Sequence, residues 1–355
     1  MKLLITGICG FVGKTLATSL LKEQEGLEVI GVDNLIRPGS ELNRPKLAEL
    51  GIKFFHADIR SSSDLDVLPP ADYVIDAAAN ASVLAGLGQQ GASRQLLEHN
   101  LGGTINLLEY CRKHRAGFIL LSTSRVFSIA PLAALEIEVV AKAFRPRAQQ
   151  SWPAGCSLEG IAENFSTQPP ISLYGSTKLA SEILAFEYGS AFAFPVWCNR
   201  CGVLTGAEQF GRTDQGIFSY WIHAYASNKV LKYTGFNGTG HQVRDALHPE
   251  DLVPVLRRQM ATGSPTLEAP LNFGGGAANS MSLAQLTDWC AARFGPHPVA
   301  AEPAPRPFDI PWLVMDSRAA ARRWAWKPRR NLESILEELG RHAEQNPDWL
   351  ERTAT

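Results

Sequence analysis

The sequence has no excess of charge of either sign and no long apolar run. Its 355 residues include 34 Lys and Arg against 35 Asp and Glu, a formal net charge of -1, so no overall positive field is available to hold a polyanion such as DNA. A nucleic-acid partner is therefore not expected. No apolar run approaches the roughly 18–20 residues that cross a bilayer, and Gly7 interrupts the apolar start before a leader could form. We expect a soluble, unprocessed protein that has no membrane partner.

Cysteine is also scarce, with 6 in the whole chain. A chain of this length buries enough apolar surface to fold without crosslinks, so a disulfide framework is not expected and a reducing cytoplasm is the favoured location. Cys198 and Cys201 form a Cys-x-x-Cys pair, which is an alternative candidate for a redox pair or half of a zinc site. The pair falls in a predicted buried strand, and no second Cys or His pair stands at ligand spacing. We therefore expect two core thiols and no metal.

Apolar residues make up 45% of the chain and are grouped in short continuous runs. Continuous apolar strands that alternate with helical patterns are typical of a parallel sheet covered by helices on both faces. Single cores stop growing near about 250–300 residues, so we expect a main domain and a smaller companion. The predicted strands are 2–6, 27–33, 52–56, 73–79, 118–122 and 195–203, and the predicted helices include 103–112 and 174–188.

These patterns predict an α/β fold in two parts. Residues 1–204 should form mainly a doubly wound parallel sheet of the Rossmann type, and residues 205–355 mainly a smaller α/β lobe that is interleaved with the first part. Residues 128–160 fit neither the helical nor the strand period. We expect them to form an insertion over the sheet edge or over an active site.

Three glycines, Gly7, Gly10 and Gly13, stand at the first predicted strand-to-helix turn. A backbone without side chains lets a pyrophosphate approach the N-terminus of the following helix. The alternative is an ordinary turn, but the position between a strand and a helix favours a dinucleotide site.

An acidic residue ends the second predicted strand, since Asp33 stands twenty residues beyond Gly13. A carboxylate there can accept both hydroxyls of the adenosine ribose and repels a 2′-phosphate, so NAD is favoured over NADP. Arg37, four residues further on, could pair with a phosphate, but it could equally be a solvated loop charge.

Tyr174 and Lys178 stand four residues apart in a predicted helix and therefore on one face of it. A neighbouring ammonium, together with the positive charge of a nicotinamide, should lower the pKa of the phenol toward neutrality, so that it can remove a hydroxyl proton. Thr123, at the end of the predicted strand 118–122, supplies a hydroxyl that could hold the same substrate oxygen. The alternatives are a solvated helix pair and a strand-end cap.

Together, the three glycines, Asp33, Thr123 and the Tyr174–Lys178 pair resemble the extended short-chain dehydrogenase/reductases, which include the nucleotide-sugar epimerases and dehydratases. The resemblance covers nearly the whole chain and implies an NAD-dependent enzyme that acts on a nucleotide-diphosphate sugar. Further cofactor-binding positions that it implies are Phe11, Val12, Asn34, Asp58, Ile59, Ala77, Ala78 and Asn100, together with Tyr174 and Lys178, whose ammonium would hold the nicotinamide ribose. In the C-terminal part it implies that Arg244, Arg306 and Asp309 bind the substrate, with the arginines facing its diphosphate and nucleoside.

Within this family, the segments 33–39, 214–216, 240–248 and 279–283 most resemble the CDP-paratose (CDP-tyvelose) 2-epimerases. That resemblance implies transient oxidation at C2 of a CDP-hexose and return of the hydride to the other face. It also implies a homodimer. Two departures stand out: Asp76 precedes Ala77 where the family often has a histidine, and Ser124-Arg125 follows Thr123 where the 4,6-dehydratases carry an Asp-Glu acid/base pair.

Three alternatives remain open from the sequence. A 4-epimerase and a reductase of nucleotide-linked sugars belong to the same family. A non-catalytic, NAD-sensing regulatory protein could use the same fold, because a fold does not determine a function. The intact Tyr174–Lys178 pair favours an enzyme.

Overall fold

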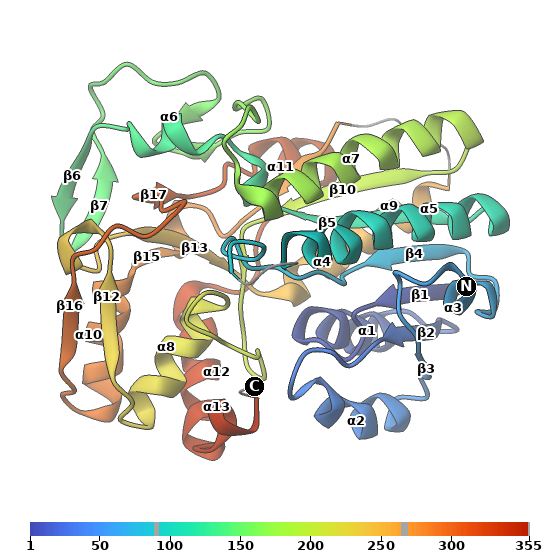
Figure 1. Ribbon diagram of the computed structural model, residues 1–355, viewed down its shortest axis with the longest axis horizontal. Helices are drawn as coiled ribbons and strands as arrows, with labels where there is room; N and C mark the ends of the chain where they lie inside the picture. The colour runs from blue at the N-terminus through green and yellow to red at the C-terminus, as the bar shows by residue number, and fades with distance from the viewer. Residues whose placement is uncertain (89–91, 264–268, 354–355) are drawn as a thin grey trace.

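Seven parallel strands form the central sheet of the computed structural model, which describes residues 1–88, 92–263 and 269–353 (Figure 1). The strands lie in the order β14-β10-β5-β4-β1-β2-β3, and each neighbouring pair is parallel. Their bounds are β1 Lys2–Thr6, β2 Glu28–Asp33, β3 Lys53–His56, β4 Tyr73–Asp76, β5 Gly117–Thr123, β10 Val196–Cys201 and β14 Leu271–Phe273. The doubly wound α/β fold is confirmed, and all six predicted strands belong to this sheet.

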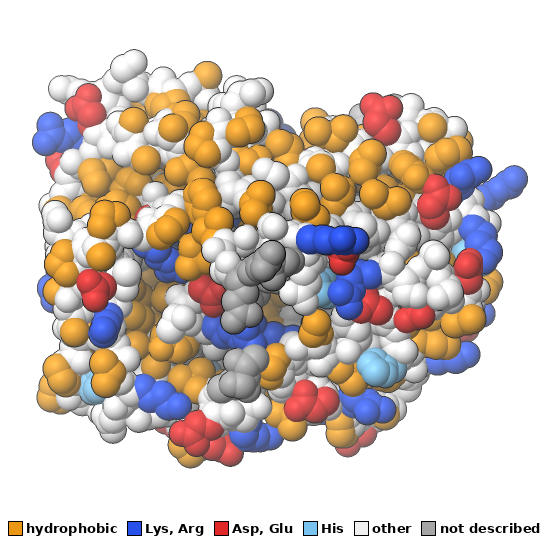
Figure 2. Space-filling model, viewed as in Figure 1, with side chains coloured by type: hydrophobic (Ala, Val, Ile, Leu, Met, Phe, Trp, Pro, Cys, Tyr) orange, Lys and Arg blue, Asp and Glu red, His pale blue; other side chains and the backbone are white. Residues whose placement is uncertain are grey.

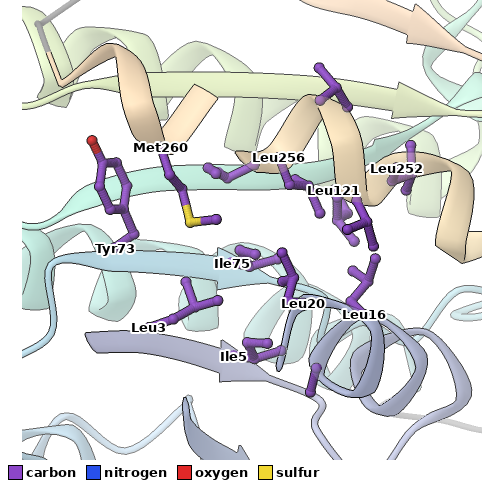
Figure 3. Close-up of a cluster of buried hydrophobic side chains, with 14 of the residues drawn as sticks. Leu3, Ile5, Leu16, Leu20, Tyr73, Ile75, Leu121, Leu252, Leu256 and Met260 are labelled. Atoms are coloured by element: carbon purple, nitrogen blue, oxygen red, sulfur yellow. The ribbon is translucent and has the colours of Figure 1, made fainter. Parts of the chain in front are cut away.

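Helices cover both faces of the sheet. The side chains of β1, which point alternately to the two faces, show why the strands of the sheet are continuously apolar. Leu3 and Ile5 pack on one face with Leu16 and Leu20 (Figure 3), whereas Leu4 packs in the cluster on the other face. Successive side chains of a strand point to opposite faces, so a strand covered on both sides needs apolar residues throughout. The first face is covered by α1 Phe11–Glu23 and α9 Val253–Thr262, and the second by α3 Ser62–Asp66, α5 Gly103–His114 and α7 Ser172–Phe192.

The second part of the chain contributes to this sheet as well as forming its own lobe. β14 pairs with β10, and α11 (Arg318–Trp324) packs near it through Ala320 and Trp324 in the first core cluster. The sheet therefore contains chain from both sides of residue 204.

The C-terminal lobe packs helices on small sheets around a separate apolar cluster. Its helices are α8 Ile217–Ala226, α10 Leu283–Phe294, α12 Leu332–Gln345 and α13 Trp349–Arg352. Its strands are β11 Val203–Leu204, β13 Val243–Leu247, β15 Ser280–Ser282 and β17 Trp312–Leu313 in one sheet, and β12 Leu231–Thr234 with β16 Val299–Glu302 in another. None of the described helices in either part is long and apolar enough to cross a membrane.

The insertion expected at 128–160 packs against the C-terminal lobe rather than over the edge of the seven-stranded sheet (Figure 1). The amide of Phe144 donates to the carbonyl of His241 at 2.8 Å, and Lys142 pairs with Asp288 on α10 at 2.8 Å. Its elements are α6 Ile129–Ala133, the hairpin of β6 Ile137–Val140 with β7 Ala143–Pro146, and the pair β8 Cys156–Ser157 with β9 Gly160–Ile161. These short elements depend on partners that are distant in the chain, so local sequence periodicity does not predict them. The remaining helices are α2 Arg44–Glu49 and α4 Ala92–Leu97.

Candidate active site

A cavity of about 510 Å³ lies between the central sheet and the C-terminal lobe, beyond the carboxyl ends of β5 and β10. In open parallel sheets this is the edge at which ligands bind. The view in Figure 2 has basic side chains among hydrophobic ones where the two parts meet. All six predicted catalytic and substrate-binding residues line the cavity: Thr123, Tyr174, Lys178, Arg244, Arg306 and Asp309.

Tyr174 and Lys178 project from the first turns of α7 and are both buried, with 6% and 2% of their surfaces exposed. Thr123 is the last residue of β5, and its hydroxyl shares a hydrogen bond with the Tyr174 phenol. Between the two, a Cβ on Gly175 would lie 2.2 Å from the carbonyl oxygen of Arg125. Only glycine allows α7 to approach the end of β5 this closely. The structure thus brings the predicted hydroxyl, phenol and ammonium together.

The pKa of Tyr174 differs from the sequence expectation. Burial raises it to about 12, while the hydrogen bond with Thr123 and the charge of Arg125 lower it. The expected fall toward neutrality is therefore not a property of the protein alone, because desolvation of the phenolate outweighs the nearby positive charges.

The glycine turn is a close-packed cradle and not an ordinary turn. Gly7 has φ +62°, and a Cβ on Gly13 would lie 2.3 Å from the carbonyl oxygen of Gly7. Gly10 is the N-cap residue of α1 and has no side chain to cap the helix. The first amides of α1, those of Phe11 and Val12, therefore remain open to a ligand. Val12 also lines the cavity.

Asp33 ends β2 beside this turn. Its carboxylate accepts from the amide of Cys9 at 3.0 Å and from the amide of Leu35 at 2.8 Å. Burial raises the pKa of Asp33, and these backbone hydrogen bonds oppose the rise. Arg37 donates to the carbonyl of Phe210, so this loop charge has a protein partner.

The other predicted cofactor positions surround the same end of the sheet. The side chain of Asn34 donates to the carboxylate of Asp58 at 3.0 Å. The same carboxylate also accepts from the Arg60 guanidinium. Although burial opposes it, these bonds lower the pKa of Asp58. Ile59 is buried against Gly103, where a Cβ would lie 2.5 Å from the Ile59 side chain.

Ala77 and Ala78 follow β4 and touch Gly7, whose added Cβ would lie 3.0 Å from Ala77 O and from Ala78 Cα. Asp76, the departure from the family's histidine, is buried at the end of β4 and accepts from Thr6 Oγ1 at 2.8 Å. It holds the first and fourth strands together at the point where Ala77 leaves the sheet.

Asn100 lies in a π-helical turn, Glu98–Gly102, that precedes α5. Its side-chain oxygen accepts from the amide of Asn80 at 2.9 Å, and its nitrogen donates to Asn80 O and to Thr177 Oγ1. These bonds join the loop after β4 to the helix that carries Lys178, so Asn100 positions the site.

The predicted substrate residues form a second, charged wall of the cavity. Arg244 Nη2 lies 3.3 Å from Asp309 Oδ1, and Arg244 Nη1 donates to the carbonyls of Val243 and Ile310 at 2.7 and 2.8 Å. Burial lowers the pKa of Arg244, and the neighbouring charge of Arg306 lowers it further. The structure thus brings Arg244, Arg306 and Asp309 together on one wall of the cavity.

Two features of the site were missed from the sequence. Arg125, noted there only as a departure, lines the cavity. Glu182 on α7 is buried, accepts a forked pair of hydrogen bonds from Arg200 on β10, and accepts one from Ser122. The spacing of Tyr174, Lys178 and Glu182, four residues each along one helix face, was the available signal for the second feature.

The remaining candidates from the sequence are a metal site and a reactive thiol pair. No group of three or more His, Cys, Asp or Glu within them could hold a metal ion. Cys198 and Cys201 are buried free thiols, and burial raises the pKa of Cys201 to about 12.

Comparison with known proteins gives a consistent result. Residues 3–266 match the family model described as the NAD dependent epimerase/dehydratase family. The chain is 30% identical to the CDP-paratose 2-epimerase of Salmonella typhi, over 96% of this chain and 98% of that protein. It is 26% identical to a UDP-glucuronate 4-epimerase of Thermodesulfobacterium geofontis, over 98% of this chain and 97% of the relative.

Solved structures share the fold. The UDP-glucuronic acid 4-epimerase of Bacillus cereus, in complex with UDP-glucuronic acid and NAD, superposes with a TM-score of 0.75 at 24% identity, covering 97% of this chain and 99% of that one. A dTDP-glucose 4,6-dehydratase from Streptomyces venezuelae reaches a TM-score of 0.77 at 22% identity, covering 99% of each chain.

Proposed function

The chain belongs to the NAD-dependent epimerase/dehydratase family, and from this premise we propose that it inverts C2 of a hexose carried on CDP. The isomerase class is supported by two relatives that match nearly the whole chain, both of which are nucleotide-sugar epimerases. The choice of C2 and of CDP is supported by the relative at 30% identity. The observation that carries the catalytic proposal is the meeting of Tyr174, Lys178 and Thr123 with paired arginines in one cavity.

The protein presents the groups that NAD needs. At the turn of Gly7 and Gly13 there is no room for a Cβ, and the uncapped N-terminus of α1 would hold the pyrophosphate of the cofactor. Asp33, at the end of β2, would accept from the adenosine ribose, and Asn34, Asp58, Ile59, Ala77 and Ala78 would contribute to the same cofactor site. NAD, when bound, supplies the redox chemistry that removes a hydride from a sugar carbon and returns it.

The roles of the side chains follow from their positions. Tyr174 Oη accepts the proton of the reacting sugar hydroxyl and returns it at the end of the cycle. Thr123 Oγ1 orients the same oxygen, since it already shares a hydrogen bond with the phenol. Lys178, one turn further along α7 and lining the same cavity, would hold the nicotinamide ribose and add a positive charge near the phenol once the cofactor is bound.

Epimerisation does not eliminate water from the sugar, and the residues after Thr123 agree with that. Ser124 and Arg125 offer no carboxylate to carry a proton for an elimination. This favours an epimerase over a 4,6-dehydratase, which needs such groups.

Three cations of the cofactor part hold the segment that follows β11. Lys14 and Lys46 both pair with Glu208, and Arg37 donates to Phe210 O. Because these contacts close the segment against the glycine turn, we propose that NAD stays bound between turnovers and co-purifies with the protein.

The test is to incubate the purified protein, without added cofactor, with CDP-, UDP-, GDP- and dTDP-sugars in deuterated water and to follow the sugar protons. Inversion at C2 of a CDP-hexose, with no deuterium at the inverted carbon, is the expected result. Inversion at C4 would identify a 4-epimerase instead, and release of NADH a reductase. No turnover of any sugar with NAD still bound would favour a regulatory NAD-binding protein.

We also propose a homodimer formed through α5 and α7, which lie side by side (Figure 1). Ile183 and Phe192 on α7 are 57% and 42% exposed, which is high for large apolar side chains. Size-exclusion chromatography with light scattering tests this, and an Ile183→Glu variant should run as a monomer.

A further inference from the structure

Arg125 lines the cavity from a position beside the catalytic residues. It lies in the short helical turn Ser124–Val126, directly after β5, and its amide donates to Thr123 Oγ1 at 3.1 Å. Its carbonyl oxygen packs against Gly175, beside Tyr174, so closely that a Cβ there would lie at 2.2 Å. The backbone of Arg125 is therefore held beside Thr123 and Tyr174, the two residues proposed to contact the reacting oxygen.

The guanidinium of Arg125 has unused donor capacity. Its Nη1 atom is buried and has no hydrogen-bond partner, and the residue lines the cavity. Arg244 differs, because its terminal nitrogens already donate to two carbonyls and contact Asp309. A buried donor without a partner costs about 1–3 kcal/mol, and more when it is charged, so the unpaired nitrogen of Arg125 points to a ligand that satisfies it.

The surrounding charges define the ligand as an anion. Burial, together with the charges of Arg244 and Arg306, lowers the pKa of Arg125 to about 9, and Asp309 is the carboxylate that opposes this. Three guanidinium groups that share one neighbouring carboxylate repel one another unless an anion lies among them. A diphosphate provides oxygens for all three, and guanidinium groups bind phosphate oxygens in forked pairs.

The position of Arg125 also limits how a sugar nucleotide can lie. Its side chain lines the same cavity as Tyr174, Arg244 and Arg306, and its charge interacts with all three. In a nucleotide sugar the phosphate is attached at C1, so C2 is the neighbouring carbon whereas C4 lies across the ring. A cation shared between the reacting oxygen and the diphosphate fits a reaction at the carbon next to C1.

We propose that Arg125 binds the sugar-linked phosphate of the substrate and thereby presents C2, rather than C4, to Tyr174. This inference rests on the proposed function and adds the residue that selects the reacting carbon. It makes Arg125 a substrate-binding residue of the catalytic end of the cavity, distinct from Arg244, whose donors are largely occupied by the protein.

The test compares ligands that differ by one group. Arg125→Met and Arg125→Lys are purified with their bound NAD, and affinities for CMP, CDP and the CDP-hexose are measured by calorimetry. CMP lacks the sugar-linked phosphate, so its affinity should change less than about twofold. CDP and the CDP-hexose should lose about 10- to 100-fold in Arg125→Met, the value of a charged hydrogen bond, and Arg125→Lys should recover part of it. Arg94→Met is the matched control, since Arg94 pairs with Glu98 on the exposed surface.

Several results would overturn the inference. Unchanged CDP affinity with lost turnover and a shifted pH profile would mean that Arg125 acts on the Tyr174 phenol instead. Weakened binding of UDP-glucuronate alone, with UDP unaffected, would mean that it binds a sugar carboxylate. Equal loss for CMP, CDP and bound NAD would mean a structural role.

These binding measurements do not depend on which carbon inverts, so they separate this inference from the proposed function. If the sugar panel identifies another base, the mono- and diphosphates of that base replace CMP and CDP. A weakened diphosphate in Arg125→Met together with inversion at C4 in the wild type would retain the phosphate contact and overturn the selection of C2.

Discussion

The two walls of the cavity are built in opposite ways. The cofactor wall is mainly backbone: Gly7 and Gly13 exclude side chains, and α1 offers its uncapped amides. The substrate wall is made of charged side chains from two segments of the C-terminal half: Arg244 on β13, and Arg306 with Asp309 in one turn. A ligand common to a whole family can be met by the main chain, whereas the feature that distinguishes one substrate from another needs side chains that can be exchanged.

The largest expected effect lies where the walls meet. Tyr174→Phe removes the proton acceptor and keeps the ring that fills the buried site. Turnover should fall by about 10²-fold or more, since this is the usual contribution of a positioned acid or base. Bound NAD, measured by absorbance after denaturation, and CDP affinity should both persist. Activity equal to the wild type would remove Tyr174 from the mechanism.

The next change breaks the cofactor wall alone. Gly13→Ala places a Cβ 2.3 Å from Gly7 O. Because the atom it meets belongs to the backbone, no side-chain rotation can relieve the contact. We expect about 1–3 kcal/mol of lost stability from overpacking and purification largely without NAD. Gly51→Ala is the control for a glycine change, because nothing lies within 4 Å of the added Cβ there although φ is +71°. Normal NAD content in Gly13→Ala would show that the turn is looser than described.

The third change breaks the substrate wall alone. Arg306→Met removes one of the guanidinium groups that line the cavity. KM for the nucleotide sugar should rise about 10-fold, the lower range for a charged hydrogen bond, while the NAD content stays at the wild-type level. A fall in bound NAD would mean that the walls are coupled and would weaken the contrast between them.

The smallest expected effect concerns how each half buries its polar groups. The first half buries the ion pair Glu182–Arg200, and the second holds two neutral histidines, the buried His223 and the half-buried His342. His223 Nδ1 donates to Ser219 O, so its Nε2 accepts from His342 Nδ1 at 2.9 Å. Burial lowers the pKa of both to about 4; the charges of Lys14 and Lys46 also lower that of His342.

Because these histidines bind protons more readily when unfolded, their contribution to stability is present above about pH 6.5 and is lost as the pH falls toward 4. The melting temperature should drop by a few degrees between pH 7 and pH 5. His342→Gln, which cannot take up that proton, should have a smaller drop. An equal drop in both proteins would assign the acid sensitivity to other groups.

The sequence sufficed for the features that are local in the chain. The predicted strands are visible as short apolar runs. The pairing of Tyr174 with Lys178 follows from the helical repeat. The course of 128–160 was not predictable in this way, because its hairpin depends on His241 and on Asp288, which is 146 residues beyond its partner Lys142. The same holds for Arg125, whose significance arises from Arg244 and Arg306, and for the pKa of Tyr174, which depends on burial.

The strand β14 has a consequence for how such proteins diversify. It enters the central sheet beside β10 after the chain has already built part of the recognition lobe. A chimera that joins two relatives at one crossover after residue 204 would therefore import a foreign edge strand with its foreign packing. Exchange of sugar preference by recombination needs at least two junctions, one on each side of Leu271–Phe273, whereas point substitution on the charged wall leaves the sheet intact.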